Sequence, residues 1–169
     1  MKAITIWPEW AFAITHLGKR VENRSWSRSG LAGSYIAIHA GASFGGGGGM
    51  KRAQSALDRM IVAAAVAGWS PKGLEEVFTK ATAENPCADS FDPAIHVGAF
   101  VATARVVQVR RPVHLAPWET GPLCWELDDV RRLVEPIPAK GRQGLWPMLR
   151  EHQDAIADAK AKPAGGGAR

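Results

Sequence analysis

The segment GKRVENRSW, residues 18–26, decides how the chain enters its sheet, and it gathers three basic side chains, an acid and an amide before a tryptophan. The residues ahead of it predict a helix from Pro8, because proline suits a first helical turn and apolar residues recur at helical spacing through Leu17. Gly18 then occupies the position typical of the glycine that follows a helix. The segment therefore predicts a helix exit that leads into a strand.

The strand expected over residues 20–26 carries polar chemistry on one face. Side chains of a strand alternate between its two faces. One face would hold Arg20, Glu22, Arg24 and Trp26. We expect this loop and strand to form one wall of a cleft for a nucleotide or an RNA strand, with Arg20 exposed to solvent.

Further strands are predicted where β-branched and apolar residues alternate or run together between turn residues. They cover residues 2–6, 34–40, 97–109 and 123–127. A turn is expected at Asp128–Asp129, followed by a short strand to Leu133. The proline-punctuated segment 135–148 predicts extended, irregular chain.

Two helices are predicted between these strands, at Met50–Ala67 and from Pro71, with Ser70 as the N-cap. The glycine run at 45–49 lacks the Lys-Ser/Thr pair of a phosphate loop and predicts a flexible linker. The expected fold class is α+β: a small β-barrel of about five or six mostly antiparallel strands, with flanking helices and a helical insert at about residues 45–95. This domain would span residues 1–150, and residues 151–169 would hold a helix end and a disordered tail from Ala159.

Composition narrows the class of protein. The 169 residues suit one domain, and 46% hydrophobic with 22% charged residues is typical of a soluble globular protein. No apolar run approaches the ~20 residues of a membrane span, and the N-terminus lacks a signal-peptide pattern, so a cytoplasmic location is expected. Cys87 and Cys124 form no C-x-x-C pair and are expected to be free thiols.

The charge and the aromatic content favour a polyanionic partner. The formal net charge is +5, and the chain holds seven tryptophans against one tyrosine. Indole faces fill cores but also stack on nucleobases. Histidines and carboxylates show no ligand spacing, so no metal and no cofactor is expected, and a serine-hydrolase G-x-S-x-G elbow is absent from the sequence.

The order of several motifs resembles the ASCH domain family of PUA-like proteins. The motifs lie between Lys2 and Trp146 and read WPEW, GKRVENRSW, IAIHAG, GAFVATARVV, GPLCWEL and GRQGLW. The resemblance implies a PUA-like β-barrel with a cleft and RNA-related binding. An amidohydrolase branch of the wider family is implied to use a Lys-x-x-Thr pair with a glutamate, whereas the third residue after Lys19 here is Glu22.

Each candidate binding residue has a structural alternative. Lys19 and Arg24 could bind phosphate or belong to a solvated surface. Glu22 could orient Arg24 through an ion pair, or accept a hydrogen bond from a base edge or act as a general base. Asn23 could read polar edges of a base.

The aromatic candidates likewise have either a binding role or a structural role. Trp7, Trp10 and Trp26 could stack on bases or fill the core. We expect at least one of them to stack, with Trp26 favoured because it shares a face with Glu22. His39 joins the candidate set from the neighbouring strand, although a lone histidine on a strand is more often structural.

Three functions follow from this set. The first is an RNA- or nucleotide-binding module with a basic, tryptophan-lined cleft. The second is a ribonuclease or a hydrolase acting on a modified nucleoside, with Lys19 and Glu22 as catalytic groups. The third is a protein-interaction module whose basic face meets an acidic partner.

Overall fold

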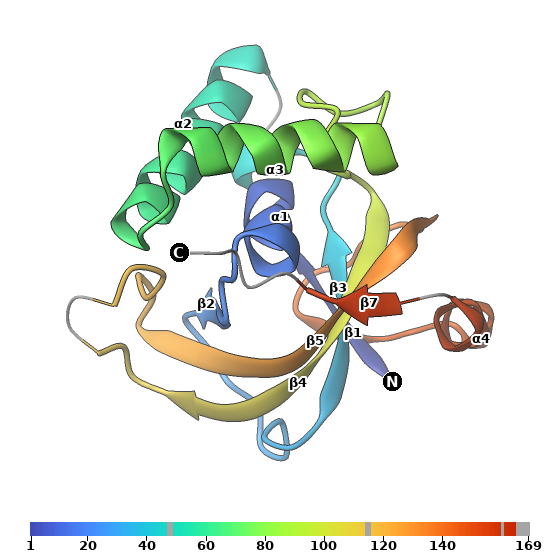
Figure 1. Ribbon diagram of the computed structural model, residues 1–169. Coiled ribbons are helices and arrows are strands. Elements are labelled where there is room, and N and C mark those ends of the chain that lie inside the picture. The colour runs from blue at the N-terminus through green and yellow to red at the C-terminus, as the bar shows by residue number, and fades with distance from the viewer. Residues whose placement is uncertain (47–48, 114–115, 160, 165–169) are drawn as a thin grey trace.

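The computed structural model describes residues 1–46, 49–113, 116–159 and 161–164 (Figure 1). The strands are β1 (Lys2–Ile6), β2 (Val21–Arg24), β3 (Tyr35–Ala40), β4 (Ala99–Arg110), β5 (Leu123–Pro138), β6 (Leu145–Pro147) and β7 (Ala161–Pro163). The α-helices are α1 (Pro8–His16), α2 (Met50–Val66), α3 (Pro71–Glu84) and α4 (Arg150–Asp158), and Phe44–Gly46 form a 3₁₀ turn.

The strands form one curled, mixed sheet in the order β2-β5-β4-β3-β1-β6, with β7 added beside β5. Strand β1 runs parallel to β3, and the other described pairs are antiparallel. In Figure 1 the long β4 and β5 ribbons sweep around one side, which gives the sheet the shape of a half-barrel. The predicted α+β class, with a mostly antiparallel curled sheet, flanking helices and a helical insert, is confirmed.

Strand β5 is longer than predicted. The turn expected at Asp128–Asp129 lies inside this one strand of 16 residues, as do residues 135–138 of the segment expected to be irregular. Residues 145–147 of that segment form β6. Asp129 has a φ of 41°, and the register between β4 and β5 shifts three times. Such irregularities let a strand absorb turn-forming residues while it bends, so the acidic pair curls the sheet instead of ending the strand.

The last described residues also differ from the prediction. Ala161–Pro163 pair with β5, and the Ala164 amide donates to the Val130 carbonyl at 2.9 Å. A disordered tail was expected here, but short backbone pairing to β5 holds these residues in the sheet. The rest of the predicted tail, residues 160 and 165–169, lies outside the described residues. Residues 47–48 of the predicted glycine linker also lie outside them.

Helix α1 is the middle layer of the domain. Its Ala11 and Ile14 pack into the core of the sheet, whereas Phe12 and Leu17 pack into a second core with α2 and α3. Figure 1 shows α1 between the sheet and the pair α2–α3. The insert therefore buries its apolar face against α1, and the position of α1 sets where the insert lies.

A third core lies on the opposite face of the sheet, beside α4, and His39 packs against it. The His39 side chain is buried, its Nε2 lies 2.9 Å from the Ala139 carbonyl, and its ring meets Phe100 and Trp146 edge-on at 5.3 and 6.0 Å. Gly141 passes directly over the ring: a Cβ built there would lie 2.7 Å from His39 Cε1. The glycine is required by this close approach.

We expect Gly141→Ala to lower the free energy of unfolding by about 1–3 kcal/mol, because the added methyl group would overpack the contact with His39. Urea denaturation followed by far-UV circular dichroism measures this change. Lys140→Ala, on the exposed neighbouring position, is the control and should leave the midpoint unchanged. Equal midpoints for Gly141→Ala and wild type would contradict the packing described.

Candidate functional site

A cavity of about 500 Å³ opens between the start of α1, strand β2 and helix α2. Six of the eight binding residues predicted from the sequence line it: Trp7, Trp10, Lys19, Glu22, Asn23 and Arg24. The remaining lining residues are Thr5, Ile6, Arg59, Ala63 and Thr120. Lys19 and residues 22–24 therefore form one wall of a hollow, together with two of the predicted indoles.

The backbone delivers Lys19 into this wall through the end of α1. Gly18 follows the helix with a φ of 71°, a conformation that glycine adopts without strain. The Lys19 amide then donates to the Ala13 carbonyl at 3.1 Å. Strand β2 starts two residues later and pairs antiparallel with β5, where Glu22 lies opposite Trp125. The turn and the strand pairing together fix the side chains of β2.

Glu22 lies between two cations at the floor of the cavity. Arg24 Nε is 2.9 Å from Glu22 Oε1, and Lys19 Nζ is 3.9 Å from Oε2. The Glu22 side chain is only 9% exposed and that of Lys19 only 2%. Charged groups withdrawn from water in this way require partners, and each of the three groups supplies one to another.

Lys19 is the most deeply buried member of this group. Its ammonium group donates to the Val21 carbonyl and lies 6.0 Å from the centre of the Trp10 ring. Burial lowers the pKa of Lys19 from its ordinary value, and the neighbouring Glu22 carboxylate opposes that shift. Lys19 is therefore a cation held inside the wall of the cavity, not on a solvated surface.

Arg24 also uses its guanidinium group internally. One terminal nitrogen donates to the Thr5 carbonyl at 2.7 Å, which ties β2 to β1 across the floor. The same group lies 5.9 Å from the centre of the Trp26 ring. The Arg24–Glu22 contact is an ion pair without the angle of a well-aligned hydrogen bond.

The two tryptophans of the cavity differ in exposure. Trp7, at the junction of β1 and α1, is 44% exposed. Trp10 is half-buried and packs against the core of the insert. A large aromatic side chain exposed at the rim of a hollow is a stacking surface that the protein's own core does not use.

Asn23 holds a loop at the rim. Its Nδ2 donates to the Trp118 carbonyl at 2.8 Å, and its Oδ1 accepts from the Thr120 and Gly121 amides at 3.1 and 3.2 Å. The amide group therefore bonds mainly to the protein's own backbone. Through these bonds Asn23 places Thr120 in the cavity wall.

Two predicted binding residues do not line the cavity. Trp26 packs edge-on against buried Trp125, with ring centres 4.9 Å apart, and belongs to the sheet core. His39 lies in the third core described above. Arg20, which was expected to be exposed to solvent, is half-buried and donates to the carbonyls of Ile14, Lys19 and Ala164. Its long side chain fills the joint between α1, β2 and the C-terminal strand.

Helix α2 contributes residues to the cavity that the sequence did not predict. Arg59 and Ala63 are one helical turn apart and both line the cavity. Their spacing on one helix face is visible in the sequence. No local signal, however, shows that this face of the insert turns toward β2.

Neither a metal centre nor a spanning helix is found in the described residues. No group of three or more histidine, cysteine, aspartate or glutamate side chains gathers in a way that could hold a metal ion among the described residues. No described helix combines the length and the apolar character needed to cross a membrane.

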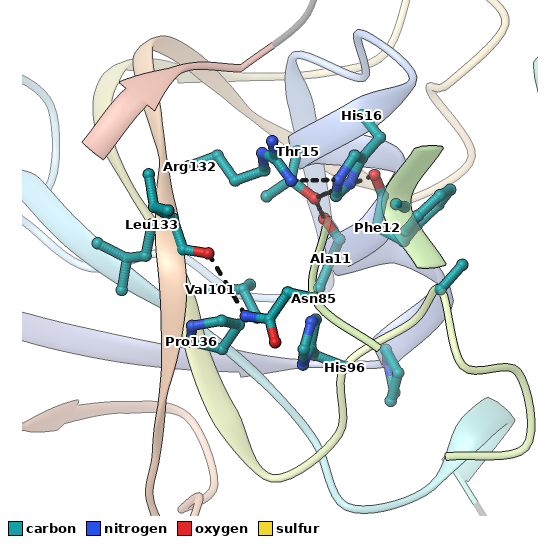
Figure 2. Close-up of a pocket in the computed structure, with 14 residues that line it drawn as sticks. Ala11, Phe12, Thr15, His16, Asn85, His96, Val101, Arg132, Leu133 and Pro136 are labelled. Carbon is teal, nitrogen blue, oxygen red and sulfur yellow. Dashed lines mark hydrogen bonds between the residues drawn. The ribbon is translucent and has the colours of Figure 1, made fainter. Parts of the chain in front are cut away.

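A second, small hollow lies on the other side of α1, between α3 and β5 (Figure 2). Its volume is about 20 Å³, room for about one water molecule. The polar groups around it bind one another: Arg132 lies 2.9 Å from His16 Nε2 and donates to Glu84 at 2.6 Å. Glu84 also accepts from Lys162 at 3.0 Å. This network fastens the insert to β5 and β7 and leaves little room for a ligand.

His16 makes this network sensitive to pH. Burial, together with the positive charge of Arg132, lowers the pKa of His16 to about 3, although Glu84 acts in the opposite direction. An unfolded histidine titrates near 6.5. As the pH falls from 6.5 toward 3, the unfolded chain therefore binds a proton that the folded chain does not. The free energy of unfolding should then fall, by at most roughly 1.4 kcal/mol per pH unit from this residue.

We expect the variant His16→Gln, which keeps an acceptor for Arg132, to show a shallower loss of stability between pH 6.5 and 4.5. Chemical denaturation at a series of pH values measures the two curves. Burial also lowers the pKa values of His39 and His96, so the difference between wild type and variant is the informative quantity. The loss of the Glu84 ion pairs, whose carboxyl has a pKa of about 2, belongs to the range below pH 4.5. Parallel curves above pH 4.5 would show that His16 is not buried in its neutral form.

The chain was compared with known proteins. No protein-family model matches it, and no curated protein matches it. One of the solved structures to which it is similar is described as the crystal structure of ASCH from Zymomonas mobilis. The two chains share 14% sequence identity with a TM-score of 0.48, and the match covers 94% of this chain and 95% of the other.

Proposed function

We propose that the protein binds a nucleotide or a short single strand of RNA in the cavity between α1, β2 and α2. The observation that carries the proposal is the joint presence of two indoles and the Lys19–Glu22–Arg24 group in one hollow of about 500 Å³. Nucleobases are recognised by stacking on aromatic rings together with hydrogen bonds to their polar edges. This cavity offers both, on a chain with a net charge of +5.

Trp7 is the stacking residue in this proposal. It is more exposed than Trp10, and it lies beside the polar floor formed by β2. Trp10 supports the wall from the insert side, where its ring already lies near the Lys19 ammonium group. Trp26, the residue first favoured for stacking, is occupied by its contact with Trp125.

Glu22 is the residue that reads the base. Arg24 holds its Oε1, whereas Oε2 lies 3.9 Å from Lys19, which is longer than a hydrogen bond. Oε2 can therefore accept a hydrogen bond from an N–H group of a base. Lys19 and Arg24 keep the carboxylate in place, so the acceptor is oriented before the ligand arrives.

We expect Trp7→Ala to weaken binding of a short single-stranded RNA by roughly 5- to 150-fold, because stacking contributes about 1–3 kcal/mol per base. Fluorescence anisotropy of a labelled oligonucleotide measures the affinity, and circular dichroism confirms folding. Tyr35→Ala is the matched control, since Tyr35 is 46% exposed and lies outside the cavity. Wild-type affinity should fall as salt rises. Flat affinity from low to moderate salt, or unchanged binding by Trp7→Ala, would remove the basis for this function.

A hydrolase is the second candidate, and the burial of Lys19 favours it. Burial lowers the pKa of the Lys19 ammonium group and so makes it a readier proton donor, and Glu22 is its neighbour. The substrates would be RNA or an acylated nucleoside. Binding alone, without turnover, would leave the first candidate in place.

If the cavity is catalytic, Lys19→Met should abolish turnover while it retains most of the side-chain volume. The assay incubates the protein with labelled RNA and with a panel of acylated nucleosides. Lys140→Met, at an exposed position, should behave like wild type. If the protein binds no oligonucleotide and turns over no substrate, the protein-interaction module is favoured instead.

A further inference from the structure

The cations of the cavity differ in how far they are already neutralised. Lys19 is bound to the Val21 carbonyl and lies near Glu22, and Arg24 is bound to Glu22 and the Thr5 carbonyl. Both are therefore committed to the protein's own acceptors. A phosphate group gains most from a cation that no carboxylate has neutralised.

Arg59 is such a cation. It lies on α2, is exposed and lines the same cavity. Its guanidinium group donates to Ser55 Oγ at 2.9 Å. Among the described residues no carboxylate oxygen lies within 4.0 Å of it, whereas Arg24 has one at 2.9 Å. Arg59 therefore offers its remaining donors to a ligand.

Arg59 also has an electrostatic partner inside the protein, the carboxyl group of Glu9. Arg59 acts on Glu9 electrostatically, but burial dominates and raises the pKa of Glu9. The Glu9 side chain is fully buried in α1, so it does not enter the cavity.

The position of Arg59 also matches the shape of a nucleotide. It lies on the wall contributed by the insert, and Glu22 lies on the wall contributed by β2. Ala63, one turn further along α2, is small and leaves space beside the guanidinium group. A ligand whose base meets Trp7 and Glu22 would have its phosphate near α2.

We infer that Arg59 binds the phosphate of the ligand and that the cavity selects phosphorylated over unphosphorylated nucleosides. This inference rests on the proposed function and adds to it the ligand class: a nucleoside monophosphate or the phosphodiester of an RNA strand. It also gives the helical insert a role, since α2 supplies the phosphate-binding cation that the sheet does not.

The test compares binding of the four nucleoside monophosphates, the matching nucleosides and a short uridine oligonucleotide. Isothermal titration at low salt measures affinities for wild type, Arg59→Ala and Arg52→Ala. Arg52 is the matched control, because it is exposed on the same helix, lies outside the cavity lining and removes the same charge. Arg59→Lys tests whether a point charge replaces the bidentate donor.

Wild type and Arg52→Ala should bind a monophosphate roughly 10- to 100-fold more tightly than its nucleoside, as expected for charge-assisted hydrogen bonds. Arg59→Ala should lose this preference and keep the nucleoside affinity. If the ligand is an RNA strand, monophosphates should bind weakly. In that case Arg59→Ala should reduce the slope of log affinity against log salt concentration for the oligonucleotide by about one, the value for one lost phosphate contact.

Two results would overturn the inference and leave the proposed function intact. One is an equal affinity of wild type for nucleosides and monophosphates, together with oligonucleotide binding that Arg59→Ala does not change. The other is an equal loss of nucleoside and monophosphate binding in Arg59→Ala. Failure of wild type to bind any of the three ligand classes would instead overturn the proposed function, and the inference with it.

Discussion

The site depends on one buried carboxylate. Glu22 is almost withdrawn from water, and it is accompanied by Lys19 on one side and Arg24 on the other. Removing either cation would leave an incompletely compensated charge in the interior, which typically costs about 3–5 kcal/mol. The three groups are brought together by the turn at Gly18 and by the pairing of β2 with β5. The fold thus places polar groups in its interior at a cost that a purely apolar floor would avoid.

That cost has a consequence for recognition. Because Arg24 also binds the Thr5 carbonyl, the Glu22 carboxylate is held from two strands and cannot easily reorient. A rigid acceptor loses less conformational entropy when a ligand binds. The Asn23 amide, which fastens Thr120 at the rim, extends the same rigidity along β2. The polar floor is therefore preorganised, and the exposed residues Trp7 and Arg59 are the parts of the cavity free to adjust.

Local patterns predicted the parts of this structure that local chemistry determines. The start of α1 at Pro8, its end before Gly18 and the N-cap of α3 at Ser70 all follow from side chains close in sequence, and the Ser70 hydroxyl indeed accepts from the Gly73 amide. Alternation along β2 correctly grouped Glu22 with Arg24. The same alternation also grouped Trp26 with them, but β2 ends at Arg24 and the chain turns Trp26 onto Trp125.

Long-range pairing decided what the sequence could not show. Asp128 and Asp129 have turn propensity. Yet Arg105 on β4 donates to Asp128 through two guanidinium nitrogens, Nε and Nη2, and keeps it within the sheet. His39 alternates toward the face opposite its isoleucines, but only the packing of Phe100, Trp146 and Gly141 reveals that this face is a core. The C-terminal strand likewise depends on a partner, β5, that lies about thirty residues earlier in the chain.

The insert is the clearest case of a segment whose role depends on a distant contact. The sheet does not need α2 and α3 to complete its hydrogen bonding, and the sequence pattern accordingly predicts them as an insert. Yet the Trp69 indole, between the two helices, donates to the Leu17 carbonyl at 3.0 Å, one residue before Gly18. The turn that delivers Lys19 to the cavity is therefore the turn to which the insert is fastened. Because one backbone turn carries Lys19 and anchors the insert, the fold fixes the backbone of both walls, and only the exposed Arg59 side chain adjusts to a ligand that spans them.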